Sequence, residues 1–207
     1  MSPPTVFLVD DDPSVLRALG RLLHSVGLNV AAFASAREFL EKQNPDAAGC
    51  LVLDVTMPGL NGLELQQALV DAGNPLPIVF LTGDGDIPMT VRAMKSGAVD
   101  FLSKPCRDAE LLGAIEQALA KDAQLREERA EQKALAARLA ALTPREHEVM
   151  LGVVAGQLNK QIAADLGTVE KTIKVHRARV MEKLRVNSVA DLVRLAERAG
   201  VRPRGPR

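Results

Sequence analysis

Residues 6–12 read Val-Phe-Leu-Val-Asp-Asp-Asp, an apolar run that ends in three carboxylates. Later apolar runs also end in, or lead to, a polar side chain: Asp54 after residues 50–53, Thr82 after residues 78–81, and Lys104 after residues 101–103. The exits of parallel strands meet at one edge of a sheet, so these side chains are expected to converge. Few reactions use carboxylates, a hydroxyl and one ammonium together, and phosphoryl transfer to an aspartate is the leading one.

The surrounding sequence alternates short apolar runs with amphipathic stretches. Strands are predicted at residues 5–9, 30–33, 50–54, 77–82 and 99–103, and helices at 14–25, 35–43, 63–72, 88–96 and 108–120. Strict alternation predicts an α/β doubly wound five-stranded parallel sheet. In the order 2-1-3-4-5 the ligand crevice lies where strands 1 and 3 are neighbours, and these strands end at Asp10 and Asp54.

Converging carboxylates need a cation. A pair about 4 Å apart repels by roughly 4 kcal/mol at an effective dielectric constant near 20. Mg²⁺ suits a site of few carboxylates because it keeps several waters and shares phosphate oxygens. Asp54 can act as the nucleophile, with Lys104 and Thr82 contacting the transferred group. Asp12, before Pro13-Ser14, is read as a helix cap.

The charge is divided between the two halves of the chain. Residues 1–120 hold 8 basic and 15 acidic residues, a net charge of −7, whereas residues 143–207 hold 13 and 7, a net of +6. This division predicts two domains, the basic one binding nucleic acid. The sequence has no long apolar run and no secretory signal pattern, which favours a cytoplasmic protein without membrane contact. Cys50 and Cys106 are read as small buried thiols, with a catalytic role or a disulfide as alternatives.

Residues 121–142 contain no Gly or Pro and favour helix, as a solvated linker running on from residues 108–120. A coiled-coil dimer is the alternative, although Glu128 and Gln132 interrupt the Leu spacing. Four helices fit the remainder, at residues 144–155, 160–166, 170–184 and 189–199, with Thr143 capping the first. The second and third have helix-turn-helix proportions. The tail, 201–207, is expected to be disordered.

Residues 4–122 resemble the receiver domain of two-component response regulators. The matching text is Val9-Asp10-Asp11, Asp54-Val55-Thr56-Met57-Pro58-Gly59 with Gly62, Thr82-Gly83 with Gly85-Asp86, and Lys104-Pro105. The resemblance implies Asp54 as phosphoacceptor; Asp10, Asp11, Asp54 and the Thr56 carbonyl as the metal site; Thr82 and Phe101 as a switch pair; and Lys104 as a phosphate contact before a cis peptide. The alternative is that Phe101 is an ordinary core strand residue, although the switch role is favoured. Asp84 departs from the family pattern, and we expect Asp84 and Thr56 to tune the phosphate lifetime.

Residues 142–199 resemble the LuxR-type helix-turn-helix domain of the FixJ and NarL groups, through Leu142-Thr143-Pro144-Arg145-Glu146, Asn159-Lys160-Gln161-Ile162-Ala163 and Lys171-Thr172-Ile173-Lys174-Val175-His176-Arg177. On the helix over 170–184, Ile173, Val180 and Leu184 form the predicted inner face. The candidate DNA contacts are Asn159, Lys160, Lys171, Thr172, Lys174, Val175, His176, Arg177 and Arg179. His176 is more often packed or phosphate-facing than a base reader. Val169 replaces a usual Ser or Thr and cannot cap, so Thr168 is expected to take that role.

The leading hypothesis is a phosphorylation-activated transcription factor rather than an enzyme. Its expected domains are a receiver at 1–122, a helical linker at 123–141 and a LuxR-type domain at 142–207. Its expected partners are a sensor histidine kinase, promoter DNA, RNA polymerase as a further candidate, and a second copy of the chain on phosphorylation. The dimer face is expected near residues 88–96 and 99–103, with 189–199 as a second candidate. The alternatives are an aspartyl-phosphate phosphohydrolase of the haloacid dehalogenase type, and a regulator with constitutive DNA binding.

Overall fold

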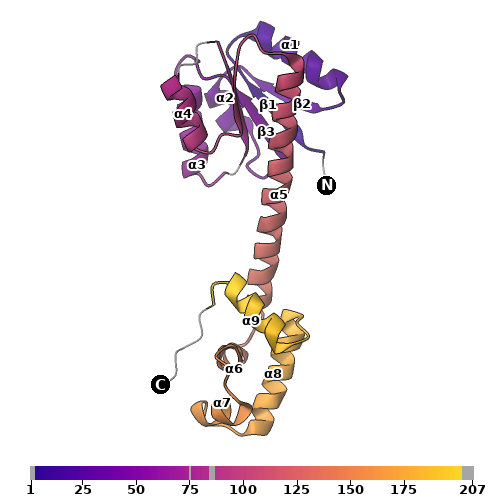
Figure 1. The fold of residues 1–207 in the computed structure, drawn as a ribbon, viewed down its shortest axis with the longest axis vertical. Helices are drawn as coiled ribbons and strands as arrows, with labels where there is room; N and C mark the ends of the chain where they lie inside the picture. Colours follow the sequence, from indigo (N-terminus) through magenta and orange to yellow (C-terminus); the bar gives the residue numbers. More distant parts are fainter. Residues whose placement is uncertain (1–2, 75, 84–86, 202–207) are drawn as a thin grey trace. The chain divides into compact units, whose positions relative to one another are not determined.

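A computed structural model describes residues 3–74, 76–83 and 87–201 (Figure 1). The first half contains a five-stranded parallel sheet in the order β2-β1-β3-β4-β5. The strands are β1 (Thr5–Val9), β2 (Asn29–Phe33), β3 (Gly49–Leu53), β4 (Ile78–Thr82) and β5 (Asp100–Ser103). Each strand bound lies within one residue of the prediction, and the predicted order is confirmed.

Helices follow the strands in strict alternation. They are α1 (Pro13–Ser25), α2 (Ala36–Lys42), α3 (Gly62–Asp71), α4 (Ile87–Lys95) and α5 (Asp108–Ala140). Asp12 caps α1 by accepting a hydrogen bond from the Ser14 amide, as predicted. Asn61 and Glu64 form a reciprocal capping box at the start of α3. These caps satisfy amides that have no partner within the helix and so fix where each helix begins.

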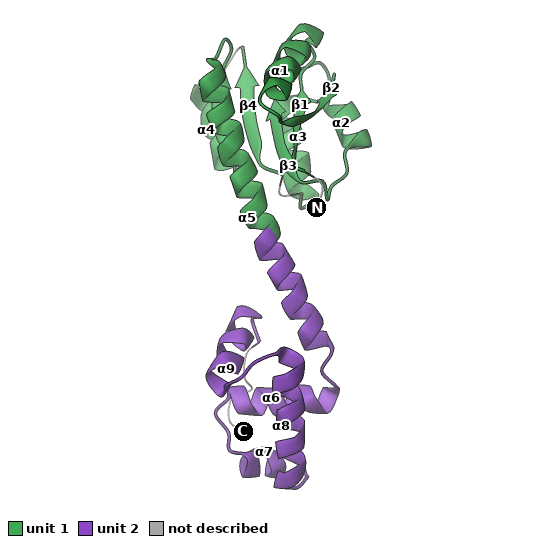
Figure 2. Ribbon diagram, turned by 90° about the vertical axis from the view of Figure 1, so that its right-hand side faces the viewer, with its two compact units in different colours: residues 1–126 green, residues 127–207 purple. Residues whose placement is uncertain are grey.

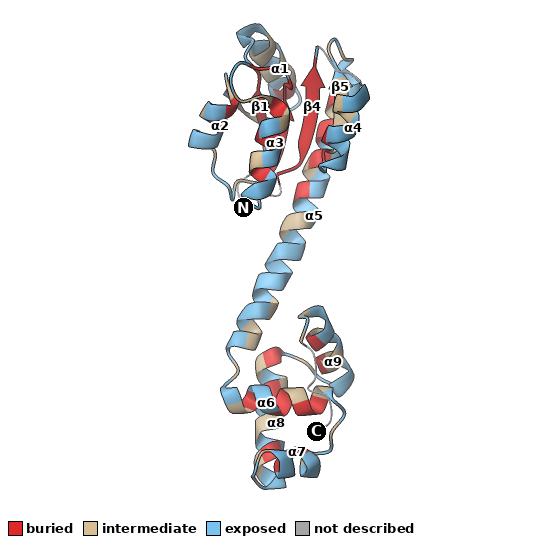
Figure 3. Ribbon diagram, turned by 90° about the vertical axis from the view of Figure 1, so that its left-hand side faces the viewer, coloured by how far each residue is buried: buried red, intermediate tan, exposed pale blue. Residues whose placement is uncertain are grey.

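Two apolar layers cover the sheet. One face packs against α2, α3 and α4 through residues such as Phe39, Leu65 and Ala93. The other packs against α1 and α5 through residues such as Leu23 and Ile115. The central strands β3 and β4 are buried along their whole length, as expected for parallel strands covered on both faces. Figure 3 shows this for β4. Both strands therefore read as continuous apolar runs.

Helix α5 continues for 33 residues, well past the apolar run that packs on the sheet. Near the middle of α5, Asp122 is buried. Its Oδ2 accepts hydrogen bonds from the Gly49 amide (2.9 Å) and from Arg126 Nε (2.7 Å). Arg126 also donates to the carbonyls of Asp46 (2.9 Å) and Ala47. These bonds join α5 to the start of β3.

The chain divides into two compact units, residues 1–126 and 127–207 (Figure 2). The second unit contains the end of α5 and helices α6 (Pro144–Val154), α7 (Asn159–Asp165), α8 (Glu170–Leu184) and α9 (Val189–Arg198). Each predicted bound of α6 to α9 lies within one residue of the observed one. Their shared core includes Val149, Ile162, Ile173 and Leu192. Among the described residues, no helix is both long and apolar enough to cross a membrane.

Candidate functional site

Three carboxylates meet where β1 and β3 end. Oxygen atoms of Asp10, Asp11 and Asp54 all lie within 4.8 Å of one another. The sheet produces this arrangement, because the Asp54 amide donates to the Val9 carbonyl at 2.9 Å and so aligns the two strand exits. Asp10 and Asp54 are buried, whereas Asp11 is exposed. The predicted acidic cluster is therefore present, with one side open to solvent.

Lys104 is the cation that contacts this cluster. Its Nζ donates to Asp10 Oδ2 at 2.6 Å and lies 3.4 Å from Asp54 Oδ2. The Lys104 amide donates to the Thr82 carbonyl at 2.7 Å, which extends the pairing of β4 and β5 to the rim. The peptide between Lys104 and Pro105 is cis, as the resemblance implies. One ammonium among three carboxylates leaves the cluster net negative.

Asp54 is the least satisfied carboxylate of the cluster. Its side chain is 8% exposed, and its Oδ1 is buried without a hydrogen-bond partner. Burial raises the pKa of Asp54, the Lys104 ammonium opposes that rise, and the Asp10 carboxylate adds to it. A buried carboxylate oxygen that lacks a donor, beside other carboxylates, fits a hard cation or an electrophilic phosphorus.

The other predicted members of this site differ in how far they are buried. Thr82 is fully buried at the end of β4, and Thr56 is exposed in the segment after Asp54. Phe101 is half-buried on β5, and its ring centroid lies 5.8 Å from that of Phe80. Asp84 lies outside the described residues, so its predicted influence on phosphate lifetime stays a prediction.

Gly62 explains how the chain turns so closely past Asp54. Its amide donates to the Val55 carbonyl at 2.9 Å, and a Cβ here would lie 2.3 Å from the Asp54 carbonyl oxygen. A side chain would therefore push α3 away from the end of β3. The glycine within the motif has a steric cause.

Both cysteines are free, and neither is ionised readily. Cys50 is buried in β3, and burial, with a smaller contribution from the Asp122 carboxylate, raises its thiol pKa to about 12. Cys106 is half-buried, and burial raises its pKa as well. A nucleophilic cysteine needs a lowered pKa, so the interpretation as packed thiols is favoured over the catalytic alternative.

The second candidate site is the surface of α7 and α8. Ile173, Val180 and Leu184 are buried on one side of α8, as predicted. Lys171, Lys174, Val175 and Arg179 lie exposed on the other side, while Thr172, His176 and Arg177 are half-buried. Lys160 is exposed near the start of α7. The structure thus presents basic side chains on an outward helix face, as nucleic-acid phosphates require.

Arg177 and His176 are less exposed than Lys174 and Val175 on the same helix. Arg177 Nη1 donates to Asn159 Oδ1 at 3.1 Å, which ties α8 to the first residue of α7. The Nδ1 of His176 is buried without a hydrogen-bond partner. The role of His176 at DNA stays a prediction.

Helix α8 begins without a side-chain cap. Val169 occupies the N-cap position, is 65% exposed and makes no capping hydrogen bond. The expectation that Thr168 replaces it as the cap is wrong, because the helix begins at Glu170 and Val169 remains the flanking residue. The first amides of α8 are thus left available for an external acceptor such as a phosphate oxygen.

A buried ion pair that the sequence analysis did not predict stabilises the second unit. Glu146 is 2% exposed; its carboxylate accepts from the Thr143 amide at 2.9 Å and from Lys183 Nζ at 2.6 Å. Lys183 also donates to the Ala141 carbonyl at 3.1 Å. The capping-box spacing identifies Glu146 from sequence, but its partner in α8 is 37 residues away.

This ion pair makes the second unit sensitive to acid. The hydrogen bond from Lys183 is the largest cause that lowers the pKa of Glu146, to about 2 from 4.5. The ionised Glu146 contributes its full stabilisation above pH 4.5, the ordinary pKa of a glutamate. This contribution is lost as the pH falls towards 2, the pKa in the folded state. We expect the free energy of unfolding of α6 to α9 to fall as the pH is lowered from 4.5 towards 2. Amide exchange of the full chain measures it.

Glu146→Gln should reduce this pH dependence, leaving the contribution of Asp191, whose pKa the Ser188 hydroxyl and Arg194 also lower. The exposed neighbour variant Glu148→Gln should leave it unchanged, and equal behaviour of the two variants would contradict the assignment.

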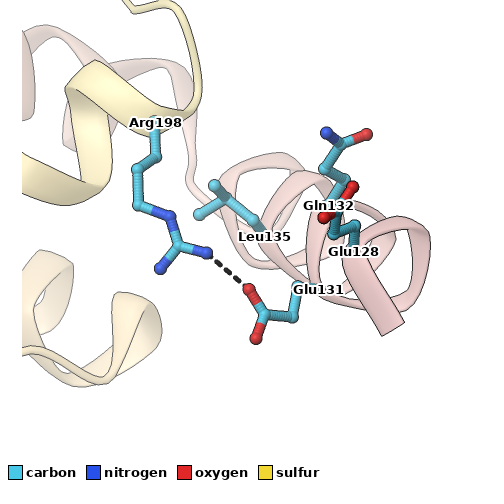
Figure 4. A pocket seen from close by; sticks show the side chains of 5 residues that line it. All are labelled: Glu128, Glu131, Gln132, Leu135 and Arg198. Carbon is cyan, nitrogen blue, oxygen red and sulfur yellow. Dashed lines mark hydrogen bonds and ion pairs between the residues drawn. The ribbon is translucent and has the colours of Figure 1, made fainter. Parts of the chain in front are cut away.

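A small pocket also lies within the second unit, between the later turns of α5 and α9 (Figure 4). Its lining is Glu128, Glu131, Gln132, Leu135 and Arg198. Arg198 already pairs with Glu131 at 2.5 Å across it. The lining has no Ser, Thr, Cys, Lys or His, and of its two carboxylates Glu131 pairs with Arg198 and Glu128 is exposed to solvent. We therefore interpret the pocket as a packing gap between two helices rather than as a candidate active site.

Comparison with known proteins gives the same division. Residues 6–116 match the response regulator receiver domain family, and residues 140–196 match the luxR family of bacterial regulatory proteins. Nodulation protein W of Bradyrhizobium diazoefficiens is 52% identical over 95% of this chain and 86% of its own length. Transcriptional regulatory protein FixJ of the same organism is 44% identical over 95% of this chain and 96% of its own length.

A solved structure of the response regulator StyR is similar with a TM-score of 0.88, at 50% identity over 95% of this chain and 99% of that one. FixJ and StyR are named as regulators, and the luxR family consists of regulatory proteins, which sets aside the phosphohydrolase alternative. A receiver domain implies a sensor kinase as partner, and a luxR-type domain implies DNA. The chain therefore belongs to the family of two-component response regulators, together with FixJ, that join a receiver domain to a LuxR-type helix-turn-helix domain.

Proposed function

We propose that a sensor histidine kinase transfers a phosphoryl group to Asp54, and that the new charge activates promoter binding by α7 and α8. The observation that carries this proposal is the Asp54 carboxylate itself. It is buried, and one of its oxygens has no donor. Oxygens of Asp10 and Asp11 lie within 4.8 Å of it, and Lys104 Nζ lies 3.4 Å from its Oδ2. We assign the receiver to residues 1–122, the linker to 123–141 and the DNA-binding domain to 142–207.

In the transfer, an Asp54 carboxylate oxygen forms a bond to phosphorus as the bond from phosphorus to the kinase histidine nitrogen breaks, and the histidine keeps that electron pair. Lys104 Nζ, 3.4 Å from Asp54, can follow the charge onto a phosphoryl oxygen. The Thr82 hydroxyl, at the end of the neighbouring strand, supplies a second donor. These groups stabilise charge rather than form covalent bonds.

Mg²⁺ fits the residues present, because three carboxylates outnumber the single ammonium and one carboxylate oxygen lacks a partner. Asp10, Asp11, Asp54 and the Thr56 carbonyl would hold the ion. When bound, it would neutralise phosphoryl oxygens as negative charge gathers on them. We expect phosphorylation to require a divalent cation for this reason.

The response is proposed to run from Thr82 and Phe101 to the surface of α4, where a second copy of the chain binds. Ile87, Val91 and Met94 recur on one side of α4 and are 81%, 44% and 42% exposed. An exposed apolar stripe of this spacing suits a helix that pairs with a copy of itself. The helix α9 is the second candidate for the dimer contact.

The outward face of α8 is proposed to enter the major groove of promoter DNA. Asn159, Lys160, Lys171, Thr172, Lys174, Val175, His176, Arg177 and Arg179 form the contacting set. RNA polymerase is a further proposed partner, since a promoter-bound regulator lies beside it. Access to the chromosome supports a cytoplasmic location without membrane contact.

The substitution Lys171→Ala is expected to weaken DNA binding at every sequence tested and to reduce the slope of log K against log salt by about 1, because one phosphate contact is lost. The measurement is a salt titration of binding to promoter fragments. Lys133→Ala, an exposed lysine on α5, is the control and should leave the slope unchanged. An unchanged slope for Lys171→Ala would remove this residue from the contact set.

The proposal is tested by DNase footprinting of the full chain with and without acetyl phosphate and Mg²⁺. Protection that appears or strengthens on adding the phosphodonor supports it. Equal protection in both samples would establish constitutive binding instead. Parallel phosphate release should be stoichiometric and slow, whereas rapid multiple turnover would contradict a regulatory role.

A further inference from the structure

Gln66 is a polar side chain within an apolar layer of the first unit. It lies on α3, is 3% exposed, and its neighbours on the inner face of that helix are Leu65 and Leu69. Burying an amide is unfavourable unless it makes hydrogen bonds, and a leucine would need none. A buried glutamine at this position is therefore expected to make a specific hydrogen bond.

The partner of Gln66 is the backbone of α4. Its Nε2 donates to the Ala93 carbonyl at 3.1 Å, and Ala93 is itself fully buried. That carbonyl also accepts from the Ala98 amide at 3.2 Å, in the turn that leads from α4 to β5. The Gln66 side chain of α3 is thus hydrogen-bonded to the last turns of α4, just before the turn that leads into β5.

The other end of α3 touches the Asp54 segment. Gly62, one helical turn before Gln66, is so close that a Cβ would lie 2.3 Å from the Asp54 carbonyl oxygen and 2.9 Å from Val55 Cα. The capping box of Asn61 and Glu64 fixes the first turn of α3. The backbone of Gly62 packs directly against that of Asp54 and Val55. A shift of the backbone at Asp54 would consequently displace α3 as a rigid helix.

From these contacts we propose that Gln66 is a positioning residue that couples the Asp54 segment to α4, along a route through α3 separate from Thr82 and Phe101. The proposal rests on the proposed function, because it concerns how phosphorylation of Asp54 reaches the apolar stripe of Ile87, Val91 and Met94. Ala93 lies on the packed side of α4 and the stripe on the exposed side, so a shift at the carbonyl of Ala93 turns the stripe.

The test uses Gln66→Met, which keeps the length and volume of the side chain but removes its donor. Gln67→Met is the matched control, because Gln67 is exposed on the same helix and bonds to Asp71 within α3. Gln66→Glu is a second variant of the same shape that places an acceptor opposite the Ala93 carbonyl. Thermal unfolding of the full chain checks that each variant folds.

Two quantities are measured on the full chain with acetyl phosphate and Mg²⁺: the rate of phosphoryl incorporation, and the phosphodonor-induced change in amide exchange over residues 87–98. For Gln66→Met we expect an unchanged incorporation rate and an induced change about fivefold smaller than in wild type, the factor expected for one lost hydrogen bond. A merely structural role would alter exchange equally with and without phosphodonor.

The outcomes separate the two proposals. If wild type and Gln66→Met show the same induced change, the coupling is overturned and the proposed function stands. If wild type takes no phosphoryl group, the proposed function fails and the coupling with it. A reduced response in Gln66→Met and Gln66→Glu, with Gln67→Met like wild type, supports the coupling.

Discussion

Asp54→Asn is expected to abolish acyl phosphate formation and most phosphodonor-dependent DNA binding. An amide cannot form the acyl phosphate, and the loss of a nucleophile lowers rates by about a thousandfold or more. The measurement is incorporation of labelled phosphate from acetyl phosphate, with footprinting on the same samples. The variant should still fold, because burial disfavours the ionised Asp54 and the amide carries no charge.

The matched control for this variant is Asp12→Asn. Asp12 is a neighbouring carboxylate whose role is to cap α1, and asparagine caps nearly as well as aspartate. The control loses the same charge in the same region and should keep phosphorylation and DNA binding. An Asp54→Asn protein that still responds fully would show that another residue accepts the phosphoryl group.

Gly49→Ala is expected to destabilise the first unit by about 3–5 kcal/mol, near the upper end for a single substitution. Gly49 has a φ of 153°, and a Cβ would lie 1.8 Å from the Thr5 carbonyl oxygen on the adjacent strand. Both the carbonyl and the glycine are backbone, so neither can rotate away. Strand β1 would have to separate from β3, which would also displace Asp10 from Asp54.

Calorimetry of the full chain measures this effect, since the transition of the first unit should shift and that of the second should not. Gly20→Ala is the control: Gly20 lies within α1, has no atom within 4 Å of a Cβ, and should be neutral or stabilised by up to about 1 kcal/mol. A small effect of Gly49→Ala would mean that the strands pair less tightly than described.

Sequence reasoning predicted the local elements of the fold well, for physical reasons. Apolar runs of strand length, with Gly27, Gly73 and Gly97 just past helix ends, are local signals; these glycines have φ values of 80°, 65° and 93°, as left-handed caps require. The acidic cluster was predictable because parallel strands have their exits on the same edge. Periodicity likewise placed Ile173 and Leu184 in the core of the second unit.

Contacts between distant segments were not predictable in this way. Asp122 lies in a polar, helix-favouring stretch that reads as solvated, yet it is buried against the Gly49 amide, 73 residues away. Gln66 gave one weak signal, a polar residue on an apolar helical face, but nothing in the sequence names the Ala93 carbonyl as its partner. The cap of α8 was misjudged because local propensity does not determine at which residue a helix begins.

The contrast between the two thiols has a practical consequence for spectroscopy. At neutral pH a thiol with a pKa near 12 is ionised on the order of one part in 100,000, and Cys50 is in addition closed off within β3. Burial raises the pKa of the Cys106 thiol as well, but Cys106 is partly accessible and lies two residues after Lys104. A maleimide fluorophore on the unaltered chain should therefore attach at one place, beside the lysine expected to follow the phosphoryl charge, and give an optical signal without engineered cysteines.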